Sequence, residues 1–229
     1  MRFVTISLIA IVIAIAGGCN RQASSESTTN RQSSSSQPET FADPQTAATQ
    51  SLTVFRKLVN NQNYKDLGFE SPDEVANATL GQPLPVMFVR LDQLRQYQPG
   101  TDVNSLLGQS NEVNYPVLAN NQVRSSVVVQ QVNGRWKTGT LGNGALAKHI
   151  ADARKARTGA EGAGQQALVH VGSLGFYFLG ERNSDNKWTL TPLVSNPDLN
   201  LAAGRAVPAE EVFSRLATAA KALRDDAPM

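Results

Sequence analysis

Few side chains in this chain of 229 residues have the types and spacing that chemistry requires. Its two histidines, His149 and His170, both lack a second histidine or a carboxylate at metal-ligand spacing. His170 stands between Val169 and Val171, so we interpret it as a packing residue of a half-buried strand. Cys19 is the only cysteine, which excludes a disulfide within the chain. The sequence therefore predicts no metal, no cofactor and no catalytic residue.

Two short motifs resemble parts of known sites but stand in the wrong context. Lys137-Thr138-Gly139 and Ser184-Asp185-Asn186 are similar to two motifs of penicillin-recognising enzymes. In that family a separate Ser-x-x-Lys nucleophile comes first and Lys-Thr-Gly comes last, whereas here Lys-Thr-Gly precedes Ser-Asp-Asn. Residues 162–167 have the glycine spacing of a dinucleotide fingerprint, but they follow a predicted helix instead of a strand. We interpret these matches as coincidences.

The aromatic residues offer a candidate ligand site. Phe176, Tyr177 and Phe178 are consecutive in a predicted strand, so Tyr177 lies on the face opposite its two neighbours. If helices cover both faces, all three belong to the core. If one face is open, Tyr177 together with a tryptophan, Trp136 or Trp188, would line a groove for a ligand or peptide.

The histidines and aromatic residues must be positioned by regular secondary structure, and several stretches of the sequence predict helices. Asp43-Pro44 predicts a helix start, with an N-cap acceptor followed by proline at the first helical position. Ser71-Pro72-Asp73-Glu74 predicts a second start, for a helix that runs to about Leu80. Further helices are predicted over residues 92–97, 102–107, 142–157 and from 208 onward, with a flexible Gly/Ala connection over 158–166.

Strand signals fill the remainder. Strands are predicted over residues 84–91, 115–119, 123–132, 135–141, 168–171, 176–181 and 188–193. Asn133-Gly134 predicts a two-residue hairpin turn, since both residue types tolerate positive φ. Because strands come in runs with short connections, we predict an α+β fold with a mostly antiparallel sheet of about six strands and flanking helices.

Two regions look alike when shifted by 52 positions. The shift places Trp136 on Trp188 and the Asn133-Gly134 turn on Asp185-Asn186. One explanation is a duplicated β-β-β-α unit, with halves at 113–157 and 166–224. Chance similarity between two ordinary hairpins explains the pattern equally well.

The N-terminal residues predict that the chain is directed to a membrane. Arg2 precedes an apolar run over residues 3–16, which is too short to span a bilayer, and two glycines and Cys19 follow. This order resembles the signal peptide and lipobox of bacterial lipoproteins; the alternative is an ordinary secretory signal. The resemblance implies cleavage after residue 18 and acylation of Cys19, with palmitate-type chains.

The mature chain then divides into a linker and a domain. Residues 19–43 are rich in serine and glutamine and poor in large apolar side chains, which predicts a disordered spacer of about 27 Å root-mean-square length. Residues 44–229 are predicted to form a single α+β domain.

Apolar motifs in the second half carry a further resemblance. They are Tyr115-Pro116-Val117, Phe176-Tyr177-Phe178-Leu179-Gly180, Leu190-Thr191-Pro192-Leu193 and Pro208-Ala209-Glu210-Glu211-Val212-Phe213. With these motifs, most of residues 80–224 resembles a group of uncharacterised bacterial lipoproteins, several of them from cyanobacteria. The resemblance implies no activity and no catalytic residue.

These observations favour a membrane-anchored envelope lipoprotein that is not an enzyme and whose domain binds a protein or another envelope component. The alternatives are a small-molecule-binding envelope module and a hydrolase with an unfamiliar site. A net charge of +2 argues against nucleic acid as a partner.

Asn20, rather than aspartate, follows Cys19. By the enterobacterial sorting pattern this implies the periplasmic face of the outer membrane in a cell with two membranes.

Overall fold

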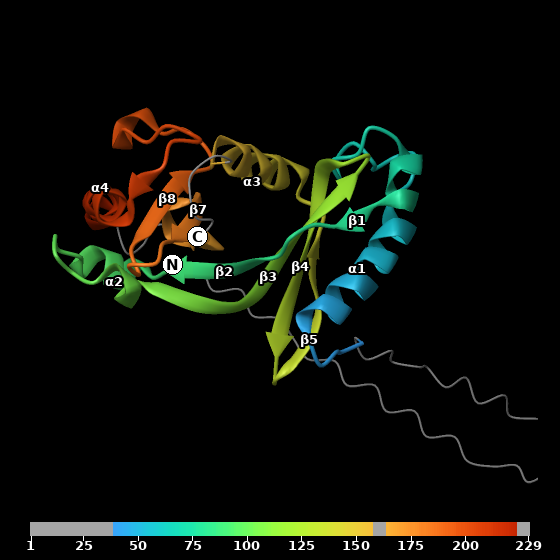
Figure 1. The fold of residues 1–229 in the computed structure, drawn as a ribbon, viewed down its shortest axis with the longest axis horizontal. Coiled ribbons are helices and arrows are strands. Elements are labelled where there is room, and N and C mark those ends of the chain that lie inside the picture. Colours follow the sequence, from blue (N-terminus) through green and yellow to red (C-terminus); the bar gives the residue numbers. More distant parts are fainter. Residues whose placement is uncertain (1–38, 158–163, 224–229) are drawn as a thin grey trace, which may run out of the picture. The chain divides into compact units, whose positions relative to one another are not determined.

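Nine strands of the described residues form one mixed sheet in the order β5-β4-β3-β2-β6-β7-β8-β9, with β1 paired to β3 (Figure 1). The computed structural model describes residues 39–157 and 164–223, which belong to a unit that spans Gln37–Met229. The strands are β1 (Thr79–Leu80), β2 (Leu84–Val89), β3 (Leu107–Ala119), β4 (Gln122–Val132), β5 (Arg135–Leu141), β6 (Gln165–Val171), β7 (Phe176–Arg182), β8 (Trp188–Pro192) and β9 (Val207–Pro208). The signal peptide, Cys19, most of the linker and residues 158–163 of the predicted Gly/Ala connection lie outside the described residues.

The α+β class and the mostly antiparallel sheet are confirmed, but the expected number of strands is wrong. The only parallel pair among the described strands is β2 with β6, where Val86 lies opposite Leu168. The described residues contain nine strands rather than about six. Two of them, β1 and β9, have two residues each, which is too short for alternating hydrophobicity to reveal them.

The β4–β5 hairpin has the predicted turn. Val132 pairs with Arg135, so Asn133 and Gly134 alone connect the strands. Their φ angles are 51° and 75°, the left-handed values that a turn with positive φ at both positions requires. Local sequence determines this turn.

Four α-helices and four short 3₁₀ helices accompany the sheet in the described residues. They are α1 (Pro44–Leu58), α2 (Leu91–Gln96), α3 (Gly144–Arg157), α4 (Ala209–Ala222), η1 (Pro72–Asn77), η2 (Val103–Ser105), η3 (Gly172–Leu174) and η4 (Pro197–Leu199). The predicted start of α1 is confirmed, because Asp43 Oδ1 accepts a hydrogen bond from the Thr46 N–H at 2.8 Å.

The helix predicted from Ser71 to about Leu80 is wrong. The segment makes only the 3₁₀ helix η1, and Leu80 belongs to β1. Val75 is the one buried residue of η1, so the segment has no apolar stripe that could hold an α-helix against the sheet. In addition, Glu74 accepts a hydrogen bond from the Glu70 N–H at 2.7 Å, instead of capping a helix that begins at Ser71. The piece predicted over 102–107 likewise shortens to η2, and Leu107 begins β3.

Helices cover both faces of the sheet. Ile150 of α3 packs with Leu168, while Phe213 of α4 packs with Val169. Since neighbouring residues of a strand point to opposite faces, α3 and α4 lie on opposite faces. Figure 1 shows α3 between the α1 end and the α4 end of the sheet.

Helix α1 lies on the same face as α4, at the other end of the sheet. Phe55 of α1 packs with Tyr115, and Leu107 of the same strand β3 belongs to the α4 cluster. Tyr115 and Leu107 are eight residues apart, an even number, so both point to one face. The middle of that face, between α1 and α4, carries the candidate site.

None of the helices within residues 39–157 and 164–223 has the length and apolar character needed to cross a membrane.

Candidate ligand-binding groove

A groove of about 410 Å³ crosses the sheet between the α1 and α4 clusters. Seven neighbouring strands contribute to its lining, from Trp136 on β5 to Trp188 on β8. Because neighbouring strands lie about 4.8 Å apart, the groove is elongated across the strands. Two other hollows have volumes of about 480 and 570 Å³, but the lining of neither contains a tryptophan.

Trp136 forms the wall at the α1 end. Its half-buried side chain packs against the α1 cluster, as does Phe41. The Phe41 N–H donates to the Trp136 carbonyl at 2.7 Å, and the Trp136 N–H donates back at 2.8 Å. This bridge on the outer edge of β5 fixes the backbone that carries the indole.

Trp188 forms the wall at the α4 end and is almost fully buried. Its Nε1–H donates to Asn104 Oδ1 at 3.0 Å. The six-membered ring lies over Gly180, where an added Cβ would come within 3.2 Å of the ring and 2.9 Å of Val169. Glycine at this position therefore lets the indole lie close against the sheet.

Arg182 is the cationic side chain of the groove. It stands between Trp188 on β8 and Gln165 on β6 in one cross-strand row. Its guanidinium carbon lies 5.8 Å from the centre of the Trp188 ring, within the range of a cation–π interaction. Its Nη2 donates to Gln165 Oε1 at 2.5 Å. Two neighbours thus orient a charge at the groove.

A bulge in β3 shapes the floor. Pro85 pairs with Val113 and Met87 pairs with Gln109, so residues 110–112 of β3 stand opposite Val86 alone. The Ser110 hydroxyl donates to the Val86 carbonyl at 2.8 Å and accepts from the Glu112 N–H at 3.1 Å, which closes the bulge. Bulges of this kind re-aim side chains and are frequent beside functional sites.

Side-chain amides dominate the polar part of the lining. They belong to Gln109, Asn111, Gln131 and Gln165, whereas the Gln166 side chain points to the α3 face, where its Oε1 accepts from Arg154 Nε at 3.1 Å. Each amide offers both a donor and an acceptor, and the indole walls add flat apolar surface. The arrangement suits recognition of a polar, chain-like molecule through many hydrogen bonds.

The structure brings Trp136 and Trp188 to one groove but places Tyr177 elsewhere. Tyr177 lies on the opposite face, where its ring stacks on His170 with centroids 4.2 Å apart and planes 3° apart. His170 stands opposite Tyr177 in the β6–β7 pair. Burial lowers the pKa of His170, and the charge of Glu112 opposes part of that change. Burial and the same charge raise the pKa of Tyr177. Both rings are therefore neutral at pH 7.

The two motifs similar to penicillin-recognising enzymes lie on different parts of the sheet. Lys137-Thr138-Gly139 belongs to β5, where the Thr138 hydroxyl hydrogen-bonds the Ser51 hydroxyl at 2.7 Å. Ser184-Asp185-Asn186 lies in the β7–β8 connection, and five strands separate β5 from β8. Three or more residues that could hold a metal ion come together nowhere in the described parts of the chain.

Sequence reasoning missed Arg182 and the amides of the floor. Gln109 and Gln131 follow buried residues of their strands, Leu107 and Val129, at a spacing of two. When the next residue on the same face of a strand is polar, the part of that face which is covered by a helix ends there. That signal was present in the sequence, but the partner strands were needed to join the positions into one site.

The structure defines an α+β domain with an open groove lined by amides and two tryptophans. No protein-family model, curated protein or solved structure matches the chain.

Proposed function

We propose that this protein is a lipid-anchored lipoprotein of the bacterial cell envelope, without catalytic activity, whose α+β domain binds a chain-like envelope component in the groove. The observation that carries the proposal is the groove itself, which crosses seven strands between the only two tryptophans of the chain. Its length favours an extended ligand over a compact one. Apart from Glu112, the polar side chains of the lining are amides, a serine and an arginine, which do not exchange protons readily at neutral pH; this favours binding over catalysis.

The anchor is proposed from the sequence alone. Acyl chains on Cys19 would hold the mature protein durably in a bilayer, since each buried methylene contributes about 0.8 kcal/mol and more than one chain is attached. Absence of aspartate after Cys19 supports the periplasmic face of the outer membrane as the address.

Replacing Cys19 by alanine is expected to block acylation and cleavage, because the modified thiol is removed. The variant should remain a precursor with its first 18 residues, whereas the wild-type chain begins at an acylated Cys19. Mass spectrometry of both proteins from envelope fractions checks this. An unmodified mature N-terminus in the wild type would mean simple secretion.

Photo-crosslinking in cells tests binding in the groove. A benzophenone amino acid at position 109, which lines the groove, should give an adduct of defined mass that resists protease. The matched control is position 62, an exposed glutamine in the turns after α1 that does not line the groove. Position 131 repeats the test from β4. The same adducts from positions 109 and 62, or none from 109 and 131, would contradict the proposal.

A protein partner is the second candidate, because one edge of β3 is open within the described residues. Pairing with β4 ends where Glu112 meets Gln130, so β3 from Leu107 to Asn111 pairs only with β2. The hollow of about 570 Å³ lies there, beside Phe88, whose exposed fraction is 38%. An extended peptide could add there as a strand. The same crosslinking experiment would then give a protease-sensitive adduct of protein mass.

We also propose that the two halves arose by duplication. In support, β3-β4-β5 and β6-β7-β8 are both three-stranded antiparallel meanders followed by a helix. Each carries its tryptophan near the start of the third strand, and both tryptophans line the groove. On this hypothesis the groove is the junction of two related units.

A further inference from the structure

We infer that the ligand of the groove is an acidic oligosaccharide and that Arg182 binds its carboxylate. This inference rests on the proposed function and narrows it to a chemical class. It depends on three observations: Arg182 has no carboxylate partner within the described residues, amides line the floor of the groove, and the central strands of the floor are paired on both sides.

Arg182 is a positioned cation without a carboxylate partner in the described residues. Glu181 pairs with Arg157 at 2.9 Å. Glu112 lines the groove at the β3 bulge, and its charge acts on His170 and Tyr177; the structure gives it no ion pair with Arg182 within the described residues. Among residues 39–157 and 164–223, the neutral Gln165 is the only acceptor from Arg182, which leaves most of the five N–H donors of the guanidinium for a ligand. A planar guanidinium binds carboxylates with two parallel hydrogen bonds.

The remainder of the floor matches hydroxyl groups. A sugar hydroxyl both donates and accepts, and so does each of the amides of Gln109, Asn111 and Gln131. The exposed part of the Trp136 indole gives a flat apolar surface against which the C–H face of a sugar ring can pack.

An extended peptide fits this floor less well. Strands β2 and β6 are paired on both sides, so their backbone groups already take part in the sheet. A peptide that binds by its backbone needs a free strand edge, which the described part of the groove offers only at β3. Along the rest of the groove, recognition must come from side chains, as it does for sugars.

Tryptophan fluorescence provides the test, because both tryptophans of the chain line the groove. The probes are trigalacturonate and its fully methyl-esterified form, which has the same sugar rings without the charge. The acid should shift the emission of the wild-type protein, and added salt should weaken its binding. The ester should bind about tenfold more weakly, the loss expected from one charge-assisted contact.

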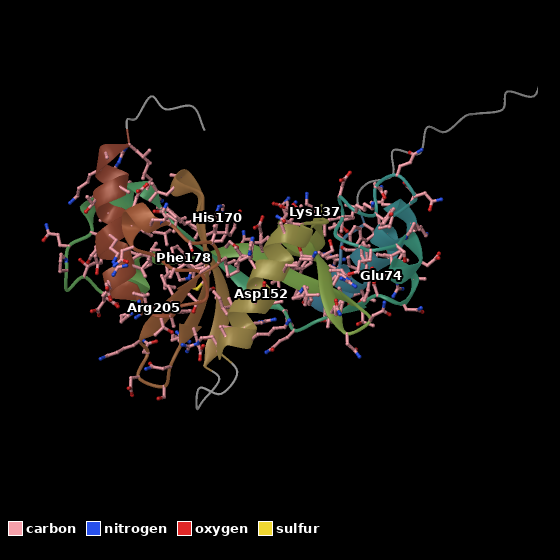
Figure 2. All side chains as sticks on the ribbon, turned by 90° about the horizontal axis from the view of Figure 1, so that it is seen from above. Glu74, Lys137, Asp152, His170, Phe178 and Arg205 are labelled. Atoms are coloured by element: carbon pink, nitrogen blue, oxygen red, sulfur yellow. The ribbon has the colours of Figure 1, made fainter. Side chains whose placement is uncertain are left out.

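Two variants locate the charge. Arg182→Gln should lose about tenfold in affinity for the acid and should bind acid and ester equally. Arg205→Gln removes the same charge from an exposed arginine outside the groove, at the α4 end of the sheet (Figure 2), and should leave the affinity unchanged. The comparison of acid with ester on the wild type requires no variant, so misfolding of Arg182→Gln would not spoil the test.

Three results would overturn the inference. One is equal binding of acid and ester to the wild type, and another is unchanged affinity in a folded Arg182→Gln variant. The third is tighter binding of triaspartate than of trigalacturonate, which would favour an acidic peptide. If the wild type binds neither sugar but position 109 still crosslinks a protease-resistant envelope component, the acidic sugar is wrong and the proposed function stands.

Discussion

Replacing Gly68 by alanine is expected to lower the free energy of unfolding by about 2–5 kcal/mol. Gly68 has a φ of 97°, a conformation that costs an L-residue about 1–2 kcal/mol. An added Cβ would also lie 2.1 Å from the Arg124 carbonyl oxygen and 2.9 Å from Gly144 Cα. Relief of such a clash typically costs about 1–3 kcal/mol more.

The clash involves backbone on both sides, so no side chain can rotate to remove it. Gly144 is the first residue of α3, and a Cβ there would in turn lie 2.7 Å from Gly68 Cα. Alanine at position 68 must therefore separate the backbone of residue 68 from β4 and from the start of α3. Because total stabilities are about 5–15 kcal/mol, a large share would be lost.

Gly100→Ala is the matched control. Gly100 has a φ of 93°, but an added Cβ there meets no atom within 4 Å. Only the conformational cost of about 1–2 kcal/mol should remain. Urea unfolding of the two variants and the wild type gives the comparison. Equal losses in the two variants would mean that the contact with Arg124 and Gly144 has no energetic importance.

The sequence predicts features that a few neighbouring residues determine. Asp43-Pro44 begins a helix and Asn133-Gly134 turns a hairpin, because in both cases the partners lie within three residues. Glu74 shows the limit of this reasoning. Its spacing from Ser71 satisfies a capping pattern, but its carboxylate binds Arg124, which lies 50 residues away in the chain. Tertiary partners override local preference there.

The groove could be predicted only in part, for the same reason. Trp136 and Trp188 stood out because tryptophan is rare, and the structure places both in one groove. The sequence groups Tyr177 with them, because no local signal says which face of the sheet its strand presents to a helix. Arg182 is held in the groove by its two cross-strand neighbours, Gln165 on β6 and Trp188 on β8. Strand order is a property of the whole chain, so single segments do not reveal such a row.

Replacing Arg124 by methionine is expected to lower the free energy of unfolding at pH 7 by about 3–5 kcal/mol, because it leaves a buried carboxylate without its cation. The Arg124 and Glu74 side chains are 7% and 8% exposed, and their charged groups lie 3.0 Å apart. Arg124 also pairs with the exposed Glu70. The control is Arg90→Met, which breaks a pair at 2.8 Å with Asp92 whose side chains are 60% and 56% exposed. That change should cost about 0–1 kcal/mol.

The pH dependence distinguishes a lost ion pair from a simple packing defect. Burial raises the pKa of Glu74, but the Glu70 N–H, the Arg124 charge and the hydrogen bonds from Arg124 and Asn120 together bring it below its ordinary value of 4.5. A group with a lowered pKa stabilises the folded state fully above its ordinary value, and this stabilisation is lost as the pH falls through the lowered pKa.

Without Arg124 the effect of burial should prevail, so the pKa of Glu74 in the folded variant should rise above 4.5. Folded Arg124→Met then binds a proton more readily than its unfolded chain and gains stability relative to the wild type as the pH falls. Urea unfolding at pH 7 and pH 4 should therefore show the gap between variant and wild type shrinking at the lower pH. A gap that stays constant would assign the loss to packing of the arginine side chain, and the buried ion pair would then contribute little to the fold.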